Sequence, residues 1–145
     1  MTLSSDALAN VINMLNVGVA VIDENNVITL FSKMAGEMLQ QDPEARVGSS
    51  ILLCHPERAE PGVLKMIEQF RTGELQKYEG FVNFIGRILY EYITPIRDDV
   101  GKYLGAIIEL HDAKEMIPAT NSSVVCSNSP ITAVSTVLAS NTWSG

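Results

Sequence analysis

The stretch Cys54-His55-Pro56 places a thiol beside an imidazole, directly after the apolar run 51–53 and directly before a helical pattern. Imidazole binds metals through a neutral ring nitrogen, and a thiolate is both a nucleophile and a soft metal ligand. Pro56 biases His55 towards an extended backbone, in which adjacent side chains point to opposite sides. We therefore expect His55 to be the ligand candidate and Cys54 to pack as a small apolar side chain, rather than act as a thiolate ligand or redox sensor. The alternative for His55 is a polar residue at a helix entry.

Two other pairs of residues are candidates for catalysis. His111-Asp112 can form an acid–base pair, but its position after the last predicted strand favours a strand-to-helix junction with Asp112 as the cap. Asp98-Asp99 precedes Gly101 in a predicted turn, which explains both carboxylates by turn preference. No nucleophile and base occur at a useful spacing, and neither common phosphate-binding glycine motif is present. We predict that the protein is not an enzyme.

Composition limits the class of protein and its partners. A chain of 145 residues with 46% hydrophobic residues can bury the core of one domain. A formal net charge of −7 opposes binding to nucleic acid or to an anionic membrane. No apolar run approaches the roughly 20 residues that span a bilayer, and no secretory signal is recognisable. We expect a cytoplasmic protein, without a disulfide framework or a zinc site, because the two cysteines lie far apart.

The chain divides into three parts: 1–16, 17–116 and 117–145. In the first part, Leu8, Val11, Ile12 and Leu15 recur at helical spacing, which predicts an amphipathic helix that can pack against a second protomer. We therefore expect a homodimer. The last part is uncharged and rich in Ser, Thr and Asn, so we predict a flexible tail, with a linker or an added strand as alternatives.

The central part alternates strand and helix patterns. "VGVAVID" and "VITLFS" are β-rich runs around the turn Glu24-Asn25-Asn26, which predicts a hairpin. A helix follows Ser32, and a longer helix is expected over 61–71, ended by Gly73. Strands are expected over 77–84, 88–96 and 103–110, joined by short connections that contain glycine. This order predicts an α+β fold in which helices cover one face of an antiparallel sheet.

The segments "NVGVAVIDENNVITLFSKMAGEMLQ" and "RDDVGKYLGAIIELHDAKE" resemble the opening and closing parts of a PAS domain. The resemblance implies a five-stranded antiparallel sheet in the order 2-1-5-4-3, with a ligand cavity between the sheet and its covering helices. The spacing of Asp112 and Glu115 is that of a capping box, which predicts a helix leaving the domain.

The segment "LLCHPERAEPGVLKMIEQF" resembles the His-Pro segment of haem-binding PAS domains in bacterial carbon-monoxide-responsive transcription regulators. It also resembles a "CHP" segment of PAS domains in a hemerythrin-linked family. The first resemblance implies haem b, held by His55 as an axial ligand of the iron. It further implies a sensor of a diatomic gas (CO, NO or O₂) that signals to a separate effector domain or protein. In those regulators a methionine from the next strand is the opposite ligand, whereas residues 67–115 here contain neither Met nor Cys, so that position is open or otherwise filled.

Four further residues are candidates for the lining of the cavity. Met66 and Phe70 lie one helical turn apart, and Phe81 and Asn83 belong to the strand expected to face them. Ordinary core packing is the alternative for the apolar three, and exposure on the other face is the alternative for Asn83. The competing function is a PAS module for dimerisation or signalling that holds another small ligand or none.

Overall fold

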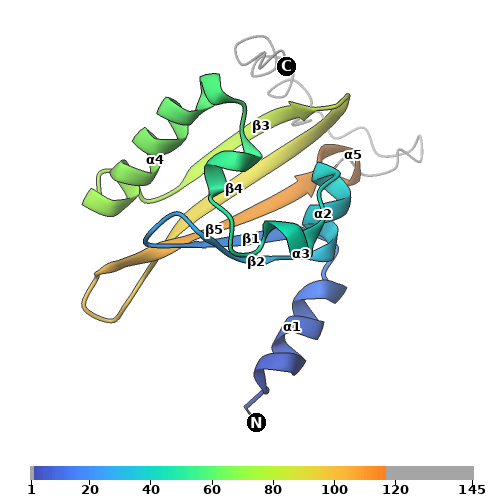
Figure 1. Cartoon of the computed structure of the whole chain (residues 1–145), viewed down its shortest axis with the longest axis horizontal. Helices are drawn as coiled ribbons and strands as arrows, with labels where there is room; N and C mark the ends of the chain where they lie inside the picture. The colour runs from blue at the N-terminus through green and yellow to red at the C-terminus, as the bar shows by residue number, and fades with distance from the viewer. Residues whose placement is uncertain (1, 117–145) are drawn as a thin grey trace, which may run out of the picture.

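The computed structural model describes residues 2–116, so the predicted tail over 117–145 lies outside the described residues (Figure 1). The helices are α1 (Ser5–Met14), α2 (Lys33–Leu39), α3 (Pro43–Arg46), α4 (Glu60–Thr72) and α5 (Ala113–Met116). The strands are β1 (Gly18–Asp23), β2 (Ile28–Phe31), β3 (Tyr78–Phe84), β4 (Arg87–Arg97) and β5 (Tyr103–Asp112). Two short 3₁₀ turns, η1 (Ile51–Cys54) and η2 (Glu57–Ala59), lead into α4.

The five strands form one antiparallel sheet in the order β2-β1-β5-β4-β3, which confirms the predicted fold class. The last strand, β5, lies in the middle of the sheet because it pairs with both β1 and β4. The predicted hairpin turn after β1 is also present, with Asn26 in the left-handed conformation at φ 65°. Figure 1 shows α4 along the β3–β4 side of the sheet, and α2 and α3 towards its other end.

Ser32 and Gly105 fix the contacts of β1 with α2 and with β5. The hydroxyl of Ser32 is buried and accepts hydrogen bonds from the backbone N–H of Ala35 (3.2 Å) and of Val19 (2.9 Å). It therefore caps α2 and ties that helix to β1. Gly105 has φ +146°, and a Cβ there would lie 1.9 Å from the carbonyl oxygen of Ile22. Only glycine allows β5 to approach β1 this closely.

Helix α1 extends away from the rest of the domain (Figure 1). None of its residues is buried, and Leu8, Val11 and Met14 are 50%, 48% and 84% exposed. Its end is attached by Asn13, whose side-chain oxygen accepts a hydrogen bond of 3.1 Å from the backbone N–H of Lys33. Within residues 2–116, no helix is both long enough and apolar enough to cross a membrane.

Candidate ligand site

The sheet has two chemically different faces, because side chains alternate along each strand. Leu89 and Ile93 of β4 are buried, and with Leu110 of β5 they join the hydrophobic core that also contains α2 and α4 residues. We call this the inner face. Tyr90, one position along β4, packs its ring 6.0 Å from the ring of His111 on the opposite, outer face.

The position of His55 is set by the turn η1. Its backbone is extended (φ −121°, ψ 148°), and its N–H donates to the carbonyl oxygen of Leu52 at 3.0 Å. The ring atom Nδ1 lies 3.0 Å from the carbonyl oxygen of Ile51. Because a carbonyl only accepts, Nδ1 carries the proton and Nε2 carries the lone pair. Within residues 2–116, Nε2 of this half-buried ring makes no hydrogen bond or ion pair. Its lone pair is therefore available to coordinate a metal ion.

Cys54 packs against the core as expected. Burial raises the pKa of its thiol, and the opposing effect of nearby Arg46 is smaller. The thiol is therefore protonated at neutral pH and is a poor nucleophile or metal ligand. The described part of the chain contains no group of three or more His, Cys, Asp and Glu residues that could hold a metal ion.

Several half-buried side chains from η1, α4, β3 and β5 pack against the core. We call them the α4-side cluster; its members are Leu52, Cys54, Val63, Met66, Tyr78, Phe84 and Ile108. Of the predicted lining residues, Met66 belongs to this cluster. Phe70 lies one turn further along α4 and is fully buried in the core.

The structure does not bring Phe81 and Asn83 together with these residues. Tyr78 and Phe84 of β3 pack on the core, so alternation turns Phe81 and Asn83 to the outer face. The Phe81 ring indeed lies 5.3 Å from that of Tyr90, and Asn83 is exposed. The strand carries aromatic residues on both faces, so its pattern did not reveal which face is inner.

Glu91 is a residue of the inner face that the sequence reasoning missed. It lies between Leu89 and Ile93 on β4, opposite Gly80 of β3 and Leu110 of β5. Burial raises the pKa of its carboxyl to about 7. Within residues 2–116 this carboxyl makes no hydrogen bond or ion pair. The available signal was its phase, since Glu91 shares the two-residue alternation of its buried neighbours.

Tyr78 gives this region a second polar group. A Cβ at Gly80 would lie 2.6 Å from the Tyr78 hydroxyl, so the ring folds over the glycine that pairs with Glu91. Burial, and then the charge of Glu91, raise the pKa of the Tyr78 hydroxyl. The inner face thus presents a phenol and a carboxyl among apolar side chains.

The other acidic candidates have structural roles. Asp112 accepts a hydrogen bond from the backbone N–H of Lys114 (2.9 Å) at the start of α5 and pairs with Arg87 (3.4 Å), as expected for a cap. Asp98 accepts from the backbone N–H of Val100 (3.0 Å) and of Lys102 (2.8 Å), as expected for a turn. These contacts account for both aspartates without catalysis.

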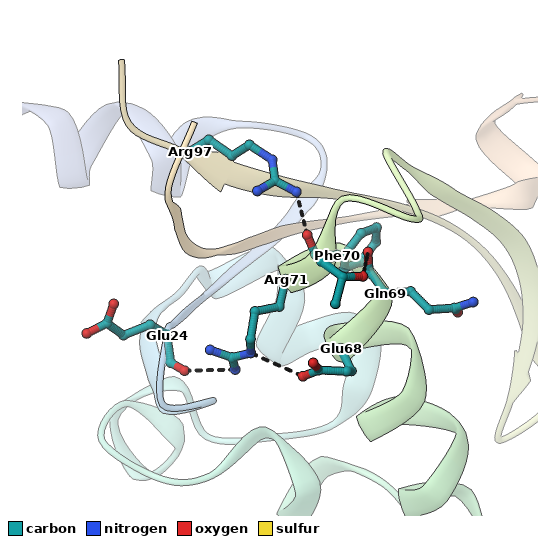
Figure 2. Close-up of polar contacts among 7 residues, drawn as sticks. Glu24, Glu68, Gln69, Phe70, Arg71 and Arg97 are labelled. Carbon is teal, nitrogen blue, oxygen red and sulfur yellow. Dashed lines mark hydrogen bonds and ion pairs between the residues drawn. The ribbon is translucent and has the colours of Figure 1, made fainter. Parts of the chain in front are cut away.

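The carboxyl-terminal end of α4 is attached to the sheet layer by two arginines (Figure 2). Arg97 of β4 donates to the carbonyl oxygen of Phe70. Arg71 donates to the carbonyl oxygen of Glu24 at 3.1 Å, and its guanidinium lies 5.1 Å from the ring centre of Tyr103. The amino-terminal end of α4, which follows His55, has no side-chain cap.

A surface cavity of about 450 Å³ lies between α2, the β3–β4 turn and α5, and of the α4-side cluster its lining includes Phe84 alone. Its lining includes Met38, Phe84, Arg87 and Asp112 but not His55 or Glu91. In this lining, Arg87 and Asp112 already pair with each other. We therefore place the candidate site at the α4-side cluster, which adjoins the inner face that carries the unpaired carboxyl of Glu91.

Comparison with known proteins agrees with this fold. A family model described as a PAS domain matches residues 8–114. The C-terminal domain of a Streptococcus mutans protein has 23% identity and a TM-score of 0.67, over 79% of this chain and 88% of that one. The PAS domain from Bordetella pertussis BvgS has 16% identity and a TM-score of 0.60, over 77% and 90%. A sensory box sensor histidine kinase from Vibrio cholerae has 15% identity and a TM-score of 0.55, over 72% and 87%. Among curated proteins, none matches this sequence.

Proposed function

Because the chain belongs to the PAS domain family, whose members are generally sensory modules, we propose that it senses a diatomic gas through haem b held by His55. The observation that carries the proposal is the 3.0 Å contact between His55 Nδ1 and the Ile51 carbonyl oxygen. A hydrogen bond at one ring nitrogen fixes the orientation of the imidazole and increases the basicity of the other nitrogen. The expected location is the cytoplasm.

The half-buried residues of η1 and α4 fit a haem ring in part. The α4-side cluster offers apolar side chains, including Leu52, Val63 and Met66, against which a porphyrin can pack. Haem, when bound, supplies an iron with a coordination position for a small gas. No Met or Cys occurs over 67–115 to fill that position from β3, β4 or β5. Tyr78 and Glu91 are the polar groups on the inner face that could meet a distal ligand.

Two helices, α4 and α5, can carry a signal from His55 to the rest of the protein. A change in the pull on His55 acts on η2 and the uncapped start of α4, while Arg97 and Arg71 hold the end of α4. The inner face connects α4 to β5, which continues directly into α5. We expect a separate effector to receive the signal there. A homodimer formed through the exposed apolar stripe of α1 would present paired outputs.

An absorption spectrum tests the proposal. Protein expressed with adequate haem, or mixed with hemin, should show a Soret band that shifts in the reduced state with CO. His55→Ala should lose or strongly shift the band. His111→Ala is the matched control, because His111 lies on the outer face, and it should leave the spectrum unchanged. A colourless protein that takes up no hemin, or a His55→Ala variant with the wild-type spectrum, refutes the proposal.

The second candidate is a PAS signalling or dimerisation module with a different small ligand or none. The unpaired carboxyl of Glu91 favours it, since an inward-facing acid without a partner can pair with a polar or cationic small ligand. In this case His55 is a helix-entry residue, and His55→Ala should fold and dimerise like the wild type.

A further inference from the structure

We propose that Glu91 is the anchor of a small-molecule site whose ligand combines a protonated amine with an apolar body. The amine pairs with the Glu91 carboxylate, and the apolar body packs in the α4-side cluster. This inference rests on the second candidate function, because the apolar body of the amine and a haem ring would occupy the same cluster, and it involves no contribution from His55.

The first argument is the position of the carboxyl. Glu91 alternates in phase with Leu89 and Ile93, which are 0% and 7% exposed, so its side chain points into the layer between sheet and helices. The cross-strand neighbours on this face are Gly80 and Leu110. Neither offers a side chain that can donate a hydrogen bond.

The second argument is the access of solvent to the carboxyl. Protein atoms surround Glu91 deeply enough to disfavour its charge, yet the residue keeps solvent contact that Leu89 and Ile93 lack. Its carboxyl oxygens are not among the fully buried polar atoms without a partner, so a ligand can reach them from solvent. Tyr78 and Ile108, its diagonal neighbours on the same face, are likewise only half-buried.

The third argument is charge. An ionised carboxylate in an apolar setting is costly unless a partner compensates it, and no protein cation within residues 2–116 pairs with Glu91. The Tyr78 hydroxyl, whose pKa is raised by burial and by the charge of Glu91, is neutral at pH 7 and does not compensate that charge. A cationic nitrogen from a ligand completes the site, and Tyr78 can accept a further hydrogen bond from the same ammonium. The acidic protein also attracts cations over anions.

The test measures binding of homologous probes to haem-free protein. Calorimetric titration compares primary alkylamines, from butylamine to octylamine, with the alcohols and carboxylates of the same length. We expect saturable binding of the amines that strengthens with chain length, and weaker binding of the matched alcohols and carboxylates. Hydrogen bonds to charged groups suggest a loss of about tenfold to a hundredfold in amine affinity for Glu91→Gln.

Controls separate this site from general electrostatics and from the haem proposal. Glu79→Gln removes an exposed carboxylate on the outer face beside Gly80, and it should leave amine affinity unchanged. Glu91→Leu, an apolar replacement that should fold even where the amide variant does not, should lose the preference for amines over alcohols. His55→Ala should keep amine binding, so failure of haem uptake does not affect this result. Equal amine affinity in wild type and Glu91→Gln, or equal binding of amines and alcohols, overturns the proposal.

Discussion

The buried carboxyl of Glu91 should make the stability of this protein fall as pH rises, and replacing it by glutamine should abolish that loss. Its pKa is about 7 in the folded state against an ordinary value of 4.5. Because the folded pKa is raised, the native state binds the proton more tightly than the unfolded chain does. Stability is therefore greatest below the unfolded pKa and declines until the pH passes the folded pKa.

The magnitude follows from the difference between the two pKa values. At 1.36 kcal/mol per pKa unit, the full effect is about 3 kcal/mol, of which about 2 kcal/mol falls between about pH 5.5 and pH 8.5. Glutamine cannot ionise, so the stability of Glu91→Gln relative to wild type should increase by that amount over the same interval. Other groups titrate in both proteins, and their contributions cancel in the difference.

The assay is urea denaturation of wild type and variant at several pH values across this interval, followed by circular dichroism. Glu79→Gln is the control, because Lys77 and then Tyr90 hold the pKa of the Glu79 carboxyl below its ordinary value. Its stability relative to wild type should therefore stay constant above about pH 5.5. A difference between Glu91→Gln and wild type that does not change with pH would refute the reasoning.

Three further outcomes follow from individual contacts. Ser32→Ala leaves two backbone N–H groups without their buried partner and should cost about 1–3 kcal/mol in urea denaturation, whereas Ser32→Thr, which keeps the hydroxyl, should cost less. Gly105→Ala places a Cβ against the backbone of Ile22 and should lower the free energy of unfolding by more than about 4 kcal/mol. Gly62→Ala, in open space on α4, should leave it unchanged or raise it by up to about 1 kcal/mol. Equal melting temperatures of the two variants would contradict this. Leu8→Glu with Val11→Glu should convert a dimer to a monomer in analytical ultracentrifugation with the domain still folded, and a persistent dimer would exclude α1 as the interface.

The elements with strong local signals could be predicted from the sequence. The turn after β1 needs a left-handed residue and contains Asn26, and the turn before β5 has Asp98 accepting two backbone hydrogen bonds. Ser32 caps α2, and Gly73 ends α4 with φ 82°. Each signal acts over a few residues, so it can be recognised without knowing the tertiary structure.

The residues of the candidate site could not be predicted in the same way, because their orientation is set by tertiary packing. Which face of β3 is inner depends on the packing of Tyr78 and Phe84, and Phe81 fits a pattern on either face. Charged residues are expected to face solvent, and the alternation of Glu91 with Leu89 and Ile93 was the signal against that expectation; the register with Gly80 and Leu110 confirms that Glu91 lies on the inner face. The bond from the His55 ring to a carbonyl four residues earlier requires the 3₁₀ turn η1, which the apolar run 51–53 does not specify.

The contacts of α4 decide how a bound ligand can affect the rest of the domain. Phe70, near its carboxyl-terminal end, is fully buried, and the adjacent backbone is held by Arg97 from β4. Val63 and Met66, nearer its amino-terminal end, are half-buried, and the chain there enters from His55 without a side-chain cap. We therefore expect a ligand that enters between α4 and the inner face to displace the His55 end of the helix more than the Phe70 end. Such a displacement would tilt α4 about the arginine contacts, and it would couple either proposed ligand group, His55 or Glu91, to the same motion.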